Sequence, residues 1–436
     1  MNSKLAALKG RAIDALAAAR SNTLLRGTLL MGAAEAGNRV SRVLTGIALA
    51  RSLGTAEFGA MALILTAYEL VRIFIHNGLG ARVMQARDEE LDEVCHGVDR
   101  LNWAVGGLMF VIQIALAWPI QYFFGANIGW LLVALSVVHL IYPLCITRAC
   151  VAQREERLGF LAGMQFFQIT GDNLCTAAMA LAGFGLWSAV IPKIVVAVAY
   201  AAITRAKVAP RKPTSVSPDM RRGLFDFCRM VIASESLNTI RANADNLIVG
   251  KVLGLEAFGI YVFAFNNGSG IASGLASALG QSVQPYLSKG KSAGDMLARF
   301  QTSVISMSLV IMPLIVLQVA LAPWYVPLIY GAKWTPAIPS VMLMCLGALS
   351  RPLIVATSML LRATGAVGLE WRMSQINALL FIVAIVGGLP FGVEGVAACV
   401  AVVNFLPAIV FARIAISTIP GALDGAPAAE FARVGA

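Results

Sequence analysis

The segment AAEAGNRVSRVLTGIALARSLGTAEFG, residues 33–59, recurs 200 residues later as ASESLNTIRANADNLIVGKVLGLEAFG, residues 233–259. Identical positions in the first copy are Ala33, Glu35, Asn38, Leu53, Gly54, Phe58 and Gly59, which match Ala233, Glu235, Asn238, Leu253, Gly254, Phe258 and Gly259. Because glutamate and asparagine are rare within apolar segments, chance is a poor explanation for these matches. The repeat therefore predicts a chain built from two duplicated halves.

Composition places this chain among membrane proteins. Hydrophobic residues make up 58% of its 436 residues, charged residues only 13%, and the mean hydropathy is +0.77. A soluble domain needs more charge to cover its surface. Since about 20 apolar residues cross a bilayer as a helix, the apolar runs predict an all-α polytopic protein with about 12 spans. They fall at 24–48, 58–78, 100–123, 128–150, 158–182, 185–204, 226–250, 258–285, 298–320, 337–361, 366–389 and 392–416.

The distribution of basic residues predicts the topology. If both termini lie on one side, 24 of the 34 lysines and arginines fall in segments on that side. The opposite loops carry only Arg51, Lys251 and Lys333. This asymmetry predicts cytoplasmic termini and an even number of spans. The net charge of +11 is thereby explained by topology, and without a nucleic-acid-binding motif we expect no nucleic-acid partner.

The offset between the copies spans six predicted helices, so both halves enter the membrane in the same direction and form pseudo-twofold-related six-helix bundles. We predict an N-lobe at 24–204, a basic cytoplasmic linker at 205–224 and a C-lobe at 225–417. Residues 1–23 form either an amphipathic cytoplasmic segment on the membrane surface or a loosely ordered basic tail. Residues 418–436 form a cytoplasmic tail. Two facing lobes would enclose a cleft, which favours a transporter.

Charged side chains recur at helical spacing inside the predicted spans. Glu35, Asn38, Arg39 and Arg42 follow the pattern i, i+3, i+4, i+7. A charge facing lipid costs roughly 3 kcal/mol, so these groups must pair or face a wet cavity. One glutamate cannot neutralise two arginines, and the surplus positive charge predicts an anionic ligand. Arginine forks fit phosphate oxygens bidentately.

Two sets of candidate site residues follow. The predicted set for a pyrophosphate or other headgroup is Arg39, Arg42, Arg241, Arg351, Asn38 and Asn238. The predicted set for charge pairing or coupling to H⁺ or Na⁺ is Glu35, Glu69, Arg72, Asp172, Glu235 and Asp245. Asp245 is the first choice for the ion, because its counterpart in the first copy is the uncharged Thr45. Polar residues that could contact sugar, or equally serve helix packing, are Asn266, Asn267, Gln281, Gln284 and Asn377.

Three further motifs of the chain resemble those of a known family. The motifs ARSLGTAEFGAMAL (50–63), NGLGARVMQ (77–85) and GFGLWSAVIPKIV (183–195) are similar, in order and spacing, to those of polysaccharide transport (Wzx-type) flippases. These flippases belong to the multidrug/oligosaccharidyl-lipid/polysaccharide (MOP) exporter superfamily, together with MATE transporters and lipid II flippases. The second copy, NADNLIVGKVLGLEAFGIY (243–261), extends the resemblance over most of the chain.

The resemblance implies a V-shaped pair of six-helix bundles and alternating access. It implies translocation of an undecaprenyl-pyrophosphate-linked oligosaccharide repeat unit across the bacterial inner membrane, for exopolysaccharide, capsule or lipopolysaccharide O-antigen synthesis. The partners would be this lipid-linked substrate, membrane lipids and the polysaccharide polymerase or chain-length machinery. We expect a monomer. The resemblance also implies a cationic central cavity. The second copy of the repeat differs from this expectation, because it carries Glu235 and Asp245 against a single arginine, Arg241.

Other classes of function are less consistent with the sequence. A MOP-type small-molecule or drug extruder would favour an acidic or aromatic pocket, against the arginine excess of the first span. A membrane polysaccharide polymerase or ligase would need a large periplasmic loop, whereas the predicted outer loops are short. The cysteines and histidines show no metal-ligand spacing. We therefore expect no enzyme activity, no metal and no cofactor beyond a coupling ion. A scaffold protein with closed ion-pair networks stays an alternative.

Overall fold

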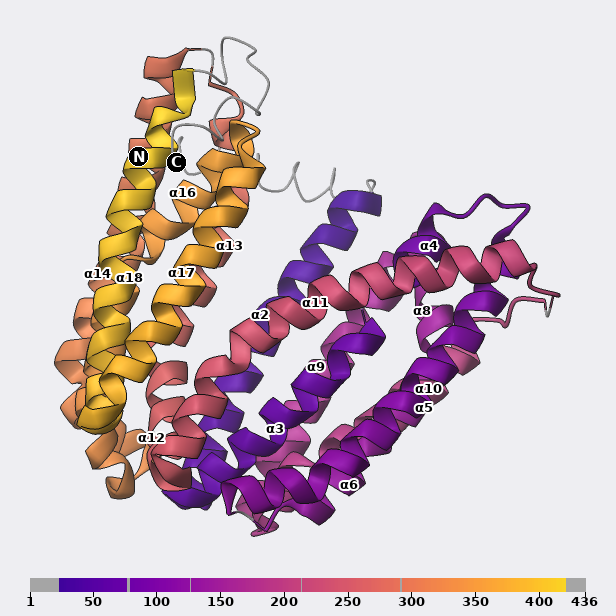
Figure 1. Cartoon of the computed structure of the whole chain (residues 1–436), viewed down its shortest axis with the longest axis horizontal. Helices are drawn as coiled ribbons and strands as arrows, with labels where there is room; N and C mark the ends of the chain where they lie inside the picture. The colour runs from indigo at the N-terminus through magenta and orange to yellow at the C-terminus, as the bar shows by residue number, and fades with distance from the viewer. Residues whose placement is uncertain (1–22, 77–78, 126, 213, 291, 421–436) are drawn as a thin grey trace, which may run out of the picture. The chain divides into compact units, whose positions relative to one another are not determined.

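A computed structural model describes residues 23–76, 79–125, 127–212, 214–290 and 292–420 of the chain (Figure 1). Within these ranges the regular elements are helices and no strand occurs, which confirms the predicted all-α fold. Each of the 12 predicted spans coincides with one helix or a run of consecutive helices. The predicted amphipathic segment and the C-terminal tail lie almost entirely outside the described residues.

Contacts within the chain define two compact units. Unit 1 contains residues up to Leu53 together with Ile64–Ile240, and unit 2 contains Gly54–Leu63 together with the residues from Arg241 onward. The boundary after Ile240 falls inside one long helix, α11 (Pro218–Val252). The first turns of α3 (Thr55–His76) belong to unit 2, although the rest of this helix belongs to unit 1.

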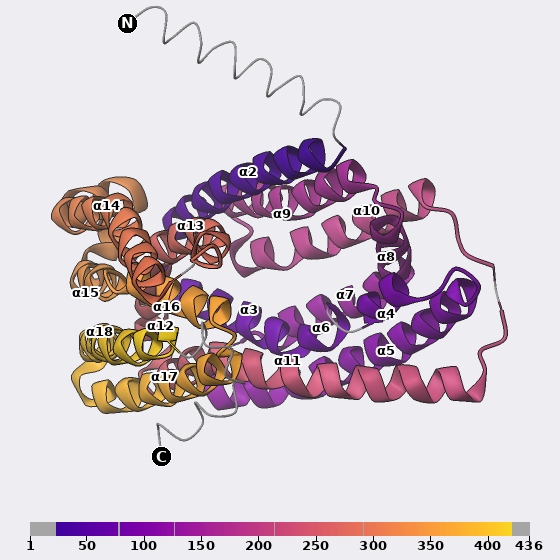
Figure 2. The ribbon, with the colours of Figure 1, turned by 90° about the horizontal axis from the view of Figure 1, so that it is seen from above.

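The two units carry the remaining helices in chain order (Figure 2). Unit 1 contains α2 (Thr23–Ser52), α4 (Leu79–Gln85), α5 (Leu91–Phe124), α6 (Gly129–Ser136), α7 (Val138–Ile141), α8 (Ile146–Arg154), α9 (Leu158–Leu181) and α10 (Ile191–Lys207). Unit 2 contains α12 (Gly254–Phe265), α13 (Ile271–Leu287), α14 (Ala293–Tyr325), α15 (Ile338–Ala348), α16 (Arg351–Ala363), α17 (Val367–Gly388) and α18 (Gly392–Ser417).

Helix lengths and surfaces are those of a multi-pass membrane protein. Five helical stretches among the described residues are long and apolar enough to cross a membrane, and a sixth qualifies if the bent stretch from α6 to α8 is one span. On α14, Ile305, Leu309 and Val316 are exposed, whereas Met307 and Ile311 are buried. Exposed large apolar side chains on a long helix are typical of a surface that faces the hydrocarbon core of a lipid bilayer. The count of 12 spans stays a prediction.

The basic linker is tied to one end of unit 1. Arg148 donates from Nη1 to the carbonyl oxygens of Arg205 and Val208, both at 3.0 Å, where α10 ends. Glu93 accepts the Ser217 backbone N–H at 2.8 Å, just before α11 begins. These bonds satisfy backbone groups that a helix end leaves without intrahelical partners. Both ends of the segment between α10 and α11 are therefore bound by side chains of unit 1.

Within unit 2 the two copies of the repeat cross at their glycines. A Cβ atom added to Gly59 would lie 2.0 Å from the carbonyl oxygen of Leu255. A Cβ atom added to Gly259 would lie 2.0 Å from the carbonyl oxygen of Thr55. The start of α3 and the start of α12 thus approach backbone to backbone, which only glycine permits. The contact is reciprocal, as expected for two related copies.

Aromatic side chains pack next to this backbone crossing. The Phe58 ring lies edge-on to the rings of Phe263 and Trp334, with centroid separations of 6.3 and 5.1 Å. Phe263 stacks on Trp334 at 4.1 Å, and the Trp334 side chain is completely buried. Such aromatic pairs contribute roughly 0.5–1.5 kcal/mol each beyond the area that they bury. The last residues of the repeat motif therefore form a core of unit 2.

Replacing Gly259 by alanine should destabilise the protein, because the new methyl group would overlap a backbone oxygen that cannot rotate away. We expect a cost of about 3 kcal/mol or more and a clear fall in the apparent melting temperature of the detergent-purified protein. Gly387→Ala is the matched control, since an added Cβ there meets nothing within 4 Å. Equal melting temperatures for the two variants would contradict the crossing.

Candidate functional site

An exposed charged face on α2 carries both predicted arginines of the first copy. Arg39 Nε lies 3.2 Å from Glu35 Oε1, and Arg42 Nη2 lies 4.0 Å from the same oxygen. The Arg39 and Arg42 side chains are 44% and 56% exposed. One carboxylate therefore serves two guanidinium groups, and this face keeps a net positive charge. Pairs this exposed contribute little to stability, so the arginines stay accessible to an anion.

The opposite side of α2 packs on α9, and there the predicted Asn38 lies. Asn38 is completely buried and accepts a hydrogen bond from Thr170 Oγ1 at 2.8 Å. Asn173 donates from Nδ2 to Ser41 Oγ at 2.9 Å, and Thr45 donates to the Asn173 carbonyl at 2.8 Å. We call these five residues the α2–α9 ladder. It fixes the rotation of α2 and leaves Arg39 and Arg42 on the outer face.

The predicted carboxylate on α9 has a partner that the sequence analysis missed. Asp172 Oδ2 lies 2.7 Å from Lys193 Nζ on α10, and the two side chains are 21% and 25% exposed. The second oxygen, Oδ1, has no hydrogen-bond partner among the described residues. One turn earlier, Gln168 donates to the Tyr142 hydroxyl at 2.7 Å. The only sequence signal for Lys193 was a single lysine inside the apolar motif GFGLWSAVIPKIV.

Glu69 and Arg72, both members of the set predicted for charge pairing or ion coupling, pair with each other within α3 at 3.3 Å. Arg72 also lies 5.9 Å above the centre of the Tyr68 ring, and Tyr68 stacks on His139 at 5.4 Å. His139 Nε2 shares a 2.6 Å hydrogen bond with Gln113 Oε1. This chain of contacts gives His139 a packing role in the centre of unit 1. It also assigns the Glu69–Arg72 pair to the same polar network.

Unit 2 holds a separate buried carboxylate. Asp245 on α11 is 6% exposed and accepts a hydrogen bond from the Tyr261 hydroxyl on α12 at 3.0 Å. Its other oxygen, Oδ1, is buried without a partner among the described residues. Arg351, at the start of α16, likewise has a buried Nε without a partner in the described part of the chain. The side chains of Glu235, Asn238 and Arg241 lie outside the described residues.

The arrangement assigns different chemistry to the two units. Unit 1 presents an exposed cationic face on α2 and contains the ion pairs Asp172–Lys193 and Glu69–Arg72. In unit 2 the buried Asp245 carboxylate accepts a hydrogen bond from the Tyr261 hydroxyl. Among the described residues no group of three or more His, Cys, Asp or Glu side chains could hold a metal ion. The two arginines of the α2 face thus offer hydrogen-bond donors to an anion.

Comparison of the fold with solved structures identifies the class of membrane protein. The chain is similar to a solved lipid II flippase in an inward closed conformation, with a TM-score of 0.73 over 91% of this chain and 90% of that one, at 13% sequence identity. It is a multi-pass membrane protein with the fold shared by MOP exporters, which confirms the predicted resemblance.

The family follows from the sequence itself. The chain belongs to the family described as polysaccharide biosynthesis proteins, which matches residues 48–339. The teichuronic acid biosynthesis protein TuaB of Bacillus subtilis is 24% identical over 350 residues, covering 77% of this chain and 71% of the relative. The succinoglycan biosynthesis transport protein ExoT of Rhizobium meliloti is 26% identical over 352 residues, covering 79% and 69%.

The Asp172–Lys193 pair should show strong coupling in a double-mutant cycle. Asp172→Asn or Lys193→Met alone leaves a half-buried charge without its partner, so each should lower the apparent melting temperature. The double variant removes both charges and should recover at least half of the loss. The measurement is thermal unfolding of all four proteins in one detergent. Simple additivity of the two effects would show that the pair contributes nothing.

Proposed function

We propose that this protein is a flippase for an undecaprenyl-pyrophosphate-linked oligosaccharide repeat unit. It would move this substrate from the cytoplasmic to the periplasmic leaflet of the bacterial inner membrane, with both termini cytoplasmic. The observation that carries the proposal is the α2 face, where two exposed arginines share one glutamate. Family membership and the MOP exporter fold support transport in polysaccharide synthesis rather than catalysis.

The charge balance of the α2 face suits a pyrophosphate. Each guanidinium can donate two parallel hydrogen bonds to phosphate oxygens. Because Glu35 is 4.0 Å from Arg42, this arginine can turn to a ligand at little cost. The α2–α9 ladder holds the backbone beneath the arginines, so their positions are set before the ligand arrives.

Coupling to an ion would use a different residue. Asp245 combines burial, one donor from Tyr261 and one oxygen without a partner among the described residues. Asp245 can take a proton or a Na⁺ ion directly, because one of its oxygens has no hydrogen-bond partner among the described residues. We propose that proton or Na⁺ binding at Asp245 biases the conformational cycle. Loss of that ion then allows the next cycle.

The Arg39→Ala/Arg42→Ala variant tests the substrate. In a deletion strain, wild type should restore polymer export, whereas the variant should reduce export at least tenfold and accumulate the lipid-linked repeat unit on the cytoplasmic side. Arg39→Lys/Arg42→Lys keeps the charge but not the bidentate fork, so it should retain partial export. Arg229→Ala, an exposed arginine on α11, is the matched control.

Two results would overturn the assignment. Normal export by the double alanine variant, at wild-type protein levels, would remove the arginines from the substrate path. Absence of any lipid-linked intermediate in the complete deletion would show that the substrate is of another class, such as a small molecule.

The Asp245→Asn variant tests the coupling residue. Asparagine mimics the protonated carboxyl in shape but cannot release a proton, so export should fall at least tenfold while the protein inserts and folds normally. Asp226→Asn on the same helix changes an exposed carboxylate, 64% exposed and 3.8 Å from Arg229, and should leave export unchanged. Export by Asp245→Asn at the wild-type rate would exclude Asp245 from coupling.

A further inference from the structure

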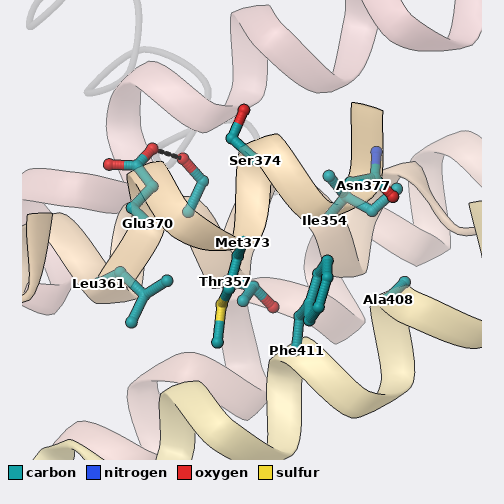
Figure 3. Close-up of a pocket in the computed structure, with 10 residues that line it drawn as sticks. Ile354, Thr357, Leu361, Glu370, Met373, Ser374, Asn377, Ala408 and Phe411 are labelled. Carbon is teal, nitrogen blue, oxygen red and sulfur yellow. Dashed lines mark hydrogen bonds between the residues drawn. The ribbon is translucent and has the colours of Figure 1, made fainter. Parts of the chain in front are cut away.

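Unit 2 contains a cavity of about 200 Å³ between α16, α17 and α18 (Figure 3). On both α16 and α17 the lining residues follow the helical spacing i, i+3, i+4, i+7. They are Ile354, Thr357, Ser358 and Leu361 on α16, and Glu370, Met373, Ser374 and Asn377 on α17. Ala408 and Phe411 of α18 complete the lining. Two matching helical stripes therefore face one space.

The cavity has polar groups on one side and an apolar base. In Figure 3, Glu370, Ser374 and Asn377 lie along one edge, whereas Met373 and Phe411 lie below them. Glu370 accepts a hydrogen bond from Ser358. Arg362 Nε donates to both Glu370 oxygens, at 2.9 and 3.0 Å. The ion pair leaves this edge neutral overall, with acceptor capacity remaining on the carboxylate.

One polar group of the cavity has no hydrogen-bond partner among the described residues. Thr357 is 5% exposed, and its Oγ1 makes no hydrogen bond within the described part of the chain. A buried hydroxyl without a partner is costly and rare in folded proteins. Because this hydroxyl belongs to the cavity lining, a ligand that occupies the cavity is placed to satisfy it.

The chemistry of the lining selects the class of ligand. An acyl or isoprenoid chain would leave the Thr357 hydroxyl and the Glu370 carboxylate without new partners, so it fits poorly. A phosphate would meet Glu370 and gain no free cation, because Arg362 is already engaged. A neutral ring that bears several hydroxyl groups satisfies both sides: its hydroxyls reach the polar edge and its C–H face covers Phe411. The volume is below the roughly 300–1,000 Å³ of drug-sized sites, so it admits a single ring.

We propose that this cavity is a binding subsite for one sugar ring of the transported oligosaccharide. The inference rests on the proposed function for its biological meaning, but the site is defined by its own residues. Glu370 and Asn377 would accept and donate hydrogen bonds at the ring hydroxyls, Thr357 would bond the group that reaches deepest, and Phe411 would pack against the ring face. The subsite would contribute to selection among repeat units.

Direct binding of simple glycosides tests the subsite. Saturation-transfer NMR on the full-length, detergent-purified protein would use methyl glycosides of hexoses, 6-deoxyhexoses and N-acetylhexosamines at millimolar concentrations. At least one should bind to wild type. Thr357→Val keeps the side-chain shape and removes a hydroxyl that has no partner in the described protein, so it should fold at least as stably as wild type. It should bind the same glycoside about tenfold more weakly, the loss expected for one hydrogen bond.

Two further variants make the result specific. Thr302→Val makes the same chemical change on α14, outside this cavity, and should bind like wild type. Thr357→Ser restores a hydroxyl and should recover most of the affinity. Absence of binding to wild type by every glycoside, or equal affinity of wild type and Thr357→Val, would overturn the proposal.

The two proposals fail separately. Glycoside binding is measured on the purified protein and does not depend on export. If export requires Arg39 and Arg42 but no glycoside binds, the flippase assignment holds and the subsite is wrong. If a glycoside binds through Thr357 but the deletion strain contains no lipid-linked intermediate, the cavity is a sugar site of a protein with another substrate.

Discussion

The backbone crossing at Gly59 and Gly259 is the contact on which unit 2 depends. A Cβ atom added at either glycine would lie 2.0 Å from a backbone carbonyl oxygen of the other copy, so neither position has room for a side chain. The crossing brings the end of one repeat copy against the end of the other and allows Phe58, Phe263 and Trp334 to pack around it. Duplication therefore did more than double the number of helices. It supplied both halves of a self-complementary contact, in which each glycine meets the backbone of the other copy.

A second constraint is the cost of charge among apolar helices. Unit 1 meets it in two ways: Asp172 and Lys193 neutralise each other across two helices, and Glu69 and Arg72 do so within one. The α2 face is different, because its arginines outnumber its glutamate and remain exposed. Such an imbalance is unfavourable in lipid, and an anionic ligand would offset it. An anionic substrate is therefore inferred from the positive charge of Arg39 and Arg42 that Glu35 alone does not neutralise.

Two polar groups of unit 2 are buried with incomplete hydrogen bonding. Asp245 Oδ1 and Thr357 Oγ1 have no hydrogen-bond partner among the described residues. The cavity beside Thr357 joins an apolar base to a neutral polar edge, a combination suited to the two faces of a sugar ring. Unit 1 and unit 2 thus provide different chemistry. An exposed cationic face suits a pyrophosphate, and a small neutral cavity suits a carbohydrate.

The sequence by itself determined the helical class, the approximate positions of the long apolar helices and the repeat, because apolar run length and identity at a fixed offset are local properties of the chain. It did not predict α4, a short helix between two predicted spans. Residues three or four apart on a helix are neighbours, so the spacing in the sequence already places Glu35 beside Arg39 and Glu69 beside Arg72. The tertiary structure alone decided that Lys193 neutralises Asp172, that Tyr261 bonds Asp245 and that Asn38 faces α9. It also decided that α16, α17 and α18 enclose a cavity. These contacts join residues of different helices, and helical periodicity specifies which face a residue lies on but not which helix will cover that face.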